Sequence, residues 1–374
     1  MKTAIVMPPG SRFCETRPNS METVVRTLAY ASQRKEDIRV FCCEGAEAYG
    51  DLPVEPLPSG RKTRLKALYR ALKAYQPDLV EIHQQAIQAT WVGGWLPDAA
   101  SILYRHNALK TSDNPIHHWR YRRRYQKVDG IVFVSESERR IFLNDFPGLD
   151  DRIHAIPNPI NADLWRGNVE DRDRIIAFAG RAMPEKGVDL ICAALPTVLD
   201  RHPDWRAVLM LNDWEYHDYW ARQHVAPLER YRNRVQVLRS APLGQVREVV
   251  KRAAIALTPS TWAEPLGLTA LEAHAAGAAL ISSGRGGLRE ASGPHALYIE
   301  DLTAPNLEAA MERLITRPEE RLALARGAQS YVFETHVPAR RAAQLDALRA
   351  RLLDAKRTVR PSALLQTRSA RRPG

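Results

Sequence analysis

The stretch TWAEPLGLTALEAHAAGAALISS, residues 261–283, contains the pattern that decides the fold of the second half of the chain. It directly follows an apolar run, AAIALTPS (253–260), that predicts a buried strand, and Pro265 and Gly267 punctuate the turn that comes next. From Leu268 the residues favour a helix that ends at Gly277, and AALISS predicts the next strand. Strand, loop, helix and strand in succession form the repeating unit of a parallel sheet.

Two carboxylates in this stretch, Glu264 and Glu272, stand eight positions apart across the predicted loop-to-helix junction. Eight helical residues rise about 12 Å, close to the length of a sugar joined to a nucleoside through a diphosphate. Eight steps of ~100° leave the side chains roughly 80° apart around the axis, which favours two separate grips on one long ligand. The alternative is that Glu264 is an acid at a helix start and Glu272 a solvated helix residue. The small apolar residues around Glu272 make an unpaired carboxylate costly there and favour the first interpretation.

The length and composition predict two globular domains in a reducing compartment. The chain has 374 residues, of which 45% are hydrophobic, and this is longer than one domain usually runs. None of its four cysteines forms a Cys-x-x-Cys pair: Cys14, Cys42, Cys43 and Cys192. The N-terminal MKTAIVMPPG predicts a first strand rather than a signal peptide, and no apolar stretch approaches the length of a membrane span. We expect a cytoplasmic protein without structural zinc.

The net charge of +11 is unevenly distributed. The last 39 residues contain ten Lys and Arg but only two acidic residues, and the remaining excess lies in patches of the first half. A basic chain raises the alternative of a nucleic-acid-binding protein, motivated also by the run RYRRRY. No recognised nucleic-acid-binding motif is present, so we expect no nucleic acid partner.

Short apolar runs alternate with helical patterns along both halves. The predicted strands are TAIVM (3–7), IRVFCC (38–43), DLVEIH (78–83), SILYRH (101–106) and GIVFVS (130–135), then IIAFAG, WRAVLML, VQVL, AAIALTPS, AALISS and ALYI. Most are continuous apolar runs, typical of parallel strands that are covered on both faces. We expect an α/β fold of two Rossmann-like domains, residues 1–165 and 166–335, whose parallel sheets face a central cleft that holds the active site.

A second group of functional candidates opens the second domain. The strand IIAFAG runs into RAMPEKG, which places Arg181 and Lys186 on a loop bounded by Gly180 and Gly187, before a helix. Backbone amides, a helix dipole and two cations would converge there on a phosphate. The alternative is an ordinary loop with solvated charges.

GRAMPEKG, PSTWAEPLGLTALEAHAAG and GRGGLRE, in this order and spacing, resemble the C-terminal half of retaining family 4 glycosyltransferases of the GT-B fold. The resemblance covers residues 174–290 and is looser in the first half. It implies that Arg181 and Lys186 bind the donor diphosphate, that Glu272 binds the ribose, and that Glu264 holds sugar hydroxyls with the backbone of Leu266, Gly267 and Leu268. It also implies that residues 336–357 form a helix that crosses back to an acceptor-binding first domain. The basic segment 358–374 reads as a disordered tail.

In the first half, His106 stands where the family places a histidine near the anomeric carbon, and Asn107 is a candidate to orient it. His83 ends another predicted strand, and both histidines have structural roles as alternatives. The candidate contacts on the acceptor side or to the donor are Gly10, Ser11, Asn19 and Ser20. Asn19 and Ser20 replace the glycine pair usual in the family and would restrict close approach of a phosphate. Either could instead cap the following helix.

The resemblance implies transfer of a sugar from a UDP- or GDP-sugar to a hydroxyl, with retention at the anomeric carbon. No second carboxylate pair suggests a glycosidase-like nucleophile, so we expect a front-face displacement in which Arg181 and Lys186 stabilise the leaving phosphate. We expect neither a metal nor another cofactor. Another sugar-nucleotide enzyme of the same fold, such as an epimerase, is the nearest alternative.

Two basic segments bear on the acceptor. Residues 61–75 and 116–127 combine Lys and Arg with apolar or aromatic side chains, which suits an anionic bilayer or a lipid-linked glycan such as lipopolysaccharide core. The alternative is two amphipathic helices with solvated basic faces. We expect a peripheral enzyme on the inner face of the cytoplasmic membrane.

Overall fold

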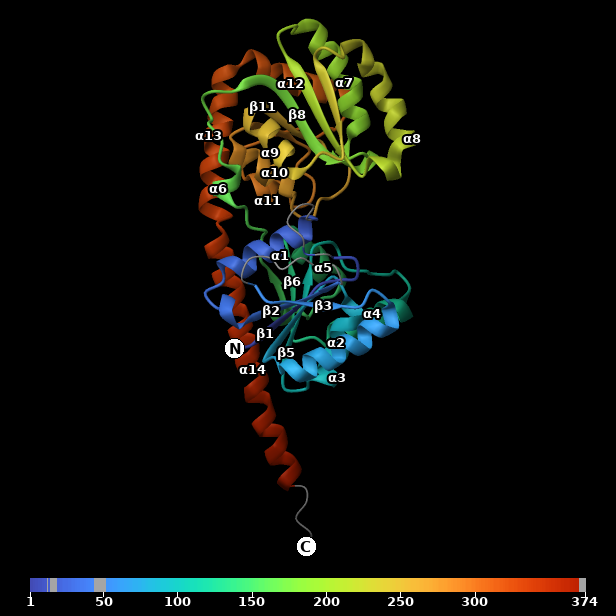
Figure 1. The fold of residues 1–374 in the computed structure, drawn as a ribbon, viewed down its shortest axis with the longest axis vertical. Coiled ribbons are helices and arrows are strands. Elements are labelled where there is room, and N and C mark those ends of the chain that lie inside the picture. Colours follow the sequence, from blue (N-terminus) through green and yellow to red (C-terminus); the bar gives the residue numbers. More distant parts are fainter. Residues whose placement is uncertain (12, 14–18, 44–51, 370–374) are drawn as a thin grey trace. The chain divides into compact units, whose positions relative to one another are not determined.

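The computed structural model describes residues 1–11, 13, 19–43 and 52–369, and the side chains among them as far as residue 358 (Figure 1). Cys14 lies outside the described residues. The chain divides into two compact units, Met1–Pro157 with Pro338–Gly374, and Asn158–Val337. The first boundary between the units thus lies after residue 157, earlier in the chain than the boundary predicted after residue 165.

Unit 1 is built on a seven-stranded parallel sheet in the order β3-β2-β1-β4-β5-β6-β7. The strands are β1 (Thr3–Val6), β2 (Ile38–Cys43), β3 (Val54–Leu57), β4 (Leu79–His83), β5 (Ala100–Arg105), β6 (Gly130–Phe133) and β7 (Ile153–Ala155). The four residues of β1 and the five of β4 are all buried, as the continuous apolar runs predict. Sequence reasoning missed β3 and β7, which are short edge strands, and Pro56 in β3 is tolerated at an edge.

Helices cover the sheet of unit 1 (Figure 1). They are α1 (Ser20–Ala31), α2 (Arg61–Tyr75), α3 (Ala86–Trp95), α4 (Pro115–Tyr125), α5 (Glu136–Asp145) and α14 (Pro338–Ser369), with short 3-10 turns at Lys35–Asp37 and Asp150–Arg152. Their starts follow capping rules: the side chain of Ser135 accepts from Glu138 N, and Asn114 caps a helix with Pro115 in its first turn. In α2, Leu68 and Leu72 turn into the core.

Unit 2 repeats the architecture with a six-stranded parallel sheet in the order β10-β9-β8-β11-β12-β13. The strands are β8 (Asp173–Arg181), β9 (Arg206–Asn212), β10 (Val235–Arg239), β11 (Ala253–Thr258), β12 (Ala279–Ser282) and β13 (Leu297–Tyr298). The helices are α6 (Ala162–Trp165), α7 (Val188–Arg201), α8 (Trp214–Val225), α9 (Leu243–Arg252), α10 (Leu268–Ala276), α11 (Leu288–Ser292), α12 (Ala304–Thr316) and α13 (Pro318–Thr335), with 3-10 turns at Pro184–Lys186 and Ala226–Tyr231. Both sheets have the strand order of a Rossmann fold.

The last helix, α14, belongs to unit 1, where it packs against α1 and β5. Its backbone is helical to Ser369, past residue 358, where composition predicts disorder. None of the described helices combines the length and apolar character of a membrane-spanning segment.

Candidate functional site

The strand order of unit 2 places its candidate site. β8 and β11 lie side by side, and the chain proceeds outward from them in opposite directions. The loops that follow two such strands diverge, and ligands of open α/β sheets bind in the space that this leaves at the carboxyl ends. β8 ends at Arg181 and β11 ends at Thr258, so both predicted donor loops start at this point.

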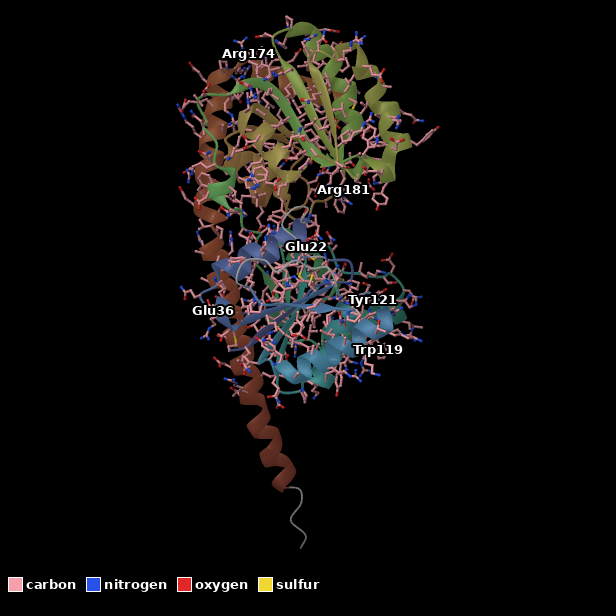
Figure 2. All side chains as sticks on the ribbon, viewed as in Figure 1. Glu22, Glu36, Trp119, Tyr121, Arg174 and Arg181 are labelled. Atoms are coloured by element: carbon pink, nitrogen blue, oxygen red, sulfur yellow. The ribbon has the colours of Figure 1, made fainter. Side chains whose placement is uncertain are left out.

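The loop after β8 holds two cations. Arg181 is exposed at the end of the strand (Figure 2), and its side chain makes no hydrogen bond or ion pair with the described residues. The chain then makes the turn Pro184–Lys186 and enters α7 through Gly187, whose φ of +69° is left-handed. Gly180, inside the end of β8, lies close to the ring of Phe178. The loop presents positive charge before a helix N-terminus, as the sequence predicts.

Glu264 is the partner of Lys186. The Lys186 Nζ lies 2.5 Å from Glu264 Oε1 and 5.4 Å from the centre of the Trp262 ring. Ser260 donates to the same Glu264 oxygen at 2.5 Å. Since Glu264 is only 7% exposed, its carboxylate and the Lys186 ammonium compensate each other in a largely desolvated place.

The backbone of Glu264 is held in a loop. It forms an isolated parallel bridge with Gly286, and its carbonyl accepts from Gly287 N at 2.7 Å. A Cβ at either glycine would fall 2.4 Å from a backbone oxygen of this loop, so both positions require glycine. The helical spacing expected between Glu264 and Glu272 is wrong, because α10 begins only at Leu268.

The start of α10 completes this part of the site. Leu266 is buried and anchors the loop in the core. Gly267 takes a φ of +97°, and the Leu288 side chain lies so close that a Cβ at this position would collide with it. Leu268 is the first helical residue. The backbone N–H groups of a first helical turn have no partner within the helix, and such groups suit hydroxyl or phosphate oxygens.

Glu272 lies one turn into α10, partly buried. Burial raises the pKa of its carboxyl to about 8, although the charge of Arg247 opposes the rise. Arg247 itself stands over the Trp165 ring at 5.6 Å. Glu272 therefore takes up a proton more readily than an ordinary glutamate, and in that form it can both donate and accept hydrogen bonds.

In unit 1, the two candidate histidines contact each other. His83 ends β4, His106 follows β5, and their Nδ1 and Nε2 atoms are 3.0 Å apart. Burial, the His83 ring and the Arg105 cation together hold the pKa of His106 well below its ordinary value, which leaves its ring neutral. The exposed Asn107 accepts from Arg105 through its backbone carbonyl. The predicted orienting contact from Asn107 to His106 is absent from the described hydrogen bonds.

The other candidates of unit 1 lie near the end of β1 and the start of α1. Gly10 N donates to Cys43 Sγ at 3.1 Å, and Ser11 is buried, with its carbonyl accepting from Cys43 N. Asn19 is the N-cap of α1, accepting from Glu22 N at 2.9 Å, and Ser20 is the first helical residue. Asn19 therefore has the capping role that its residue type favours.

Several residues of these networks were missed from the sequence. Ser260 and Trp262 lie in or beside the quoted stretch, where their polar types were the only signal. Arg349 donates to Glu81, which in turn contacts His83. Glu81 and Arg349 are far apart in the sequence, and no local sequence pattern predicts that they pair. The geometry as a whole offers two cations and a carboxylate beside a helix start in unit 2, and a hydrogen-bonded histidine pair in unit 1.

Two family profiles match the chain. The one described as glycosyl transferases group 1 matches residues 160–331, and the one described as glycosyltransferase family 4 matches residues 21–164. Between them they cover nearly all of unit 2 and most of the strands of unit 1. The chain belongs to the group 1 glycosyltransferases of family 4.

Relatives of this glycosyltransferase agree with that assignment. An alpha-maltose-1-phosphate synthase from Mycolicibacterium smegmatis is 27% identical over 292 residues, 68% of this chain and 73% of the relative. Spore coat protein SA from Bacillus subtilis is 24% identical over 349 residues, 86% and 92% of the two chains.

Solved structures share the fold, which is GT-B. A sucrose-phosphate synthase from Thermosynechococcus elongatus has a TM-score of 0.75 at 18% identity, covering 95% of this chain and 100% of that one. Anabaena HepE, in complex with UDP-glucose, has a TM-score of 0.74 at 14% identity, covering 93% and 99%. The predicted α/β fold with two parallel sheets is confirmed.

Proposed function

We propose that this glycosyltransferase moves a hexose from a UDP- or GDP-sugar to a hydroxyl of an envelope glycan or lipid-linked acceptor, with retention and without a metal ion. The observation that carries the proposal is the group of Arg181, Lys186 and Glu264 at the carboxyl ends of β8 and β11. A diphosphate at this place meets a guanidinium that no described residue engages, and the sugar beyond it meets a carboxylate.

The chemistry follows from charge. As the bond from the anomeric carbon to the diphosphate breaks, negative charge grows on the leaving oxygen, and cations held beside it lower the barrier. Arg181 is available for this without giving up a partner among the described residues. Lys186 starts paired with Glu264, so a bound diphosphate shares its ammonium, and the Glu264 carboxylate becomes free to accept from sugar hydroxyls. The leaving phosphate accepts the proton of the attacking hydroxyl on the same face of the sugar.

Glu272 is proposed to hold the ribose. Its raised pKa suits this role, since a carboxyl that keeps a proton can donate to one ribose oxygen while accepting from the other hydroxyl. In unit 1, His106 is proposed to contact the transferred sugar. Gly10, Ser11 and Ser20 stay candidates for the same region, while the Asn19 side chain caps α1. Both ring nitrogens of His83 are bonded, to His106 and Glu81.

The proposed acceptor surface combines α2, α3 and α4. Tyr69 of α2 packs edge-on against Trp95 of α3 at 5.4 Å. A cavity of about 640 Å³ then opens between α3 and α4; it is lined by Ile87, Thr90, Trp91, Trp119, Arg120, Arg123, Arg124 and Lys127. Trp119 lies on α4 (Figure 2). Its side chain is 53% exposed, and the Arg123 guanidinium lies 4.9 Å from its ring. Aromatic side chains beside cations suit the interface of an anionic membrane.

The donor assignment is tested with two arginines of one strand. Arg181 and Arg174 stand near opposite ends of β8 (Figure 2), and Arg174 pairs with Asp204 away from the proposed site. We expect Arg181→Ala to lower turnover about 10²-fold to 10³-fold, as loss of a transition-state cation does, and Arg174→Ala to leave it within about twofold. Turnover is read as release of nucleoside diphosphate from a panel of nucleotide sugars. Equal turnover in both variants would refute the assignment, and a product epimerised at the sugar would identify an epimerase.

The membrane assignment is tested by co-sedimentation with vesicles of phosphatidylglycerol or phosphatidylcholine. We expect binding to the anionic vesicles only, weakened by salt and by Trp119→Ser with Arg123→Ser. Arg140→Ser, on the exposed face of α5, is the control. Absence of salt-sensitive binding, or equal binding of the double variant, would contradict a location on the inner membrane face.

A further inference from the structure

A continuous series of hydrogen-bonded side chains runs from His106 to the C-terminal helix. His106 Nε2 lies 3.0 Å from His83 Nδ1, and His83 Nε2 lies 2.9 Å from Glu81 Oε1. The other oxygen of Glu81 accepts two bonds from Arg349, at 3.0 Å from Nε and 2.7 Å from Nη2. Arg349 comes from α14, and the rest come from β4 and the end of β5.

This series of side chains is held rigidly. The side chains of Glu81, His83 and Arg349 are at most 2% exposed. The Tyr104 ring stacks on both imidazoles, with centroids 5.0 Å away and planes within 20°. The stack holds both ring planes, and the one hydrogen bond between the rings sets which nitrogens are in contact.

The proton positions follow from Glu81. Burial alone would raise the pKa of its carboxyl, but the Arg349 charge and the bonds from His83 and Arg349 outweigh burial and lower it to about 2. A carboxylate only accepts, so the proton of His83 sits on Nε2. Arg349 also donates to Asp346 Oδ1 through Nη1, at 3.0 Å. With one proton, on Nε2, His83 presents Nδ1 as an acceptor for the Nε2–H of His106. His106 is left with an unprotonated Nδ1, and this nitrogen makes no bond to the described residues.

We propose that Glu81, His83 and Arg349 are positioning residues that fix His106 in its Nε2–H tautomer, so that Nδ1 accepts a hydrogen bond from a hydroxyl of the transferred sugar. The choice of ligand rests on the proposed function. The tautomer itself does not, because it follows from the contacts inside unit 1.

The substitution Glu81→Gln is expected to reverse the direction of these hydrogen bonds. Both bonds from Arg349 go to one oxygen of Glu81, so the amide introduced at this position turns its oxygen to the guanidinium and its NH₂ to His83. His83 Nε2 then has to accept, its Nδ1 carries the proton and donates to His106, and Nδ1 of His106 becomes a donor. Replacing one carboxylate oxygen of Glu81 by an NH₂ group thus turns His106 Nδ1 from an acceptor into a donor.

The first test is nuclear magnetic resonance of the imidazole nitrogens, using long-range ¹H–¹⁵N correlations on the full chain. We expect the Nε2–H tautomer for His106 in the wild type, the Nδ1–H tautomer in Glu81→Gln, and no change in Asp354→Asn, an exposed control on α14. His106 in the Nδ1–H form in the wild type, or a protonated His83, would overturn the proposal whether or not any variant folds. An unchanged tautomer in folded Glu81→Gln would overturn it as well.

The second test separates positioning from a structural role. We expect Glu81→Gln to lower kcat/KM for the nucleotide sugar about tenfold to hundredfold, the range expected when a hydrogen bond to substrate turns repulsive. Binding of the nucleoside diphosphate alone, which lacks the sugar, should stay within about twofold. A parallel loss of nucleoside diphosphate binding would show general damage and overturn the positioning role. Failure of the wild type to bind any nucleotide sugar would instead refute the proposed function and leave the tautomer result standing.

Discussion

Gly187 connects the cation loop of unit 2 to α7, and Gly187→Ala tests how far this loop is fixed by its backbone. The residue has a φ of +69°, and an added Cβ would lie 2.2 Å from the carbonyl oxygen of Pro259. The left-handed conformation alone costs an alanine about 1–2 kcal/mol. Relief of the overlap requires the loop to retreat by about 1 Å from the end of β11, and backbone strain with lost packing of this kind brings the total to about 3 kcal/mol.

Urea denaturation measures this loss, and Gly244→Ala is the matched control. Gly244 lies in α9 with open space around its Cβ position, so alanine there should stabilise the chain by about 0.5–1 kcal/mol through helix propensity. A retreat of the loop also separates Lys186 from Glu264, so binding of a nucleotide sugar to Gly187→Ala should weaken at least tenfold at a temperature where it is folded. A variant within about 0.5 kcal/mol of the wild type, with unchanged binding, would refute the reasoning.

Three further changes test single contacts. Because the folded chain holds the proton of Glu272 to a pKa of about 8 instead of 4.5, the free energy of unfolding should fall as pH rises through this window. The full shift is worth ~5 kcal/mol, and partial exposure reduces it to about 2 kcal/mol, which Glu272→Gln should remove when urea unfolding is compared at pH 5 and pH 9. Arg349→Met should destabilise unit 1 by about 3–5 kcal/mol in the same assay, because it strands a buried carboxylate, and adding Glu81→Gln should restore much of the loss. Asn19→Ala should cost about 1 kcal/mol in thermal unfolding, since it removes the cap of α1, and a cost near zero would show that the cap is replaced by water.

The fold could be predicted because its signals are local. The apolar runs of β8 and β11, and the glycines and cations after β8, lie within short stretches whose residue types allow few structures. The start of α10 at Leu268 was predicted from helix formers after Gly267. The edge strands β3 and β7 escaped notice because an edge strand needs neither length nor an unbroken apolar run.

The contacts within the site depended on tertiary structure. Glu264 has its position because its backbone pairs with Gly286, and helical counting through Pro265 could not reveal that. The bond from Arg349 to Glu81 joins residues 268 positions apart, and a single sequence contains nothing that links them. The types and approximate places of the candidate residues were predictable, while their pairing was not.

The return of the chain to unit 1 through α14 sets an order for folding during synthesis. Residues 158–337 are one continuous segment and can fold as soon as they leave the ribosome. Unit 1 is synthesised first, but it is complete only when Arg349 has been made. Until then, no arginine compensates the buried charge of Glu81. The amino-terminal half is therefore the last part of this glycosyltransferase to mature, and a chain that stops at residue 337 would release it with its histidine pair unsupported.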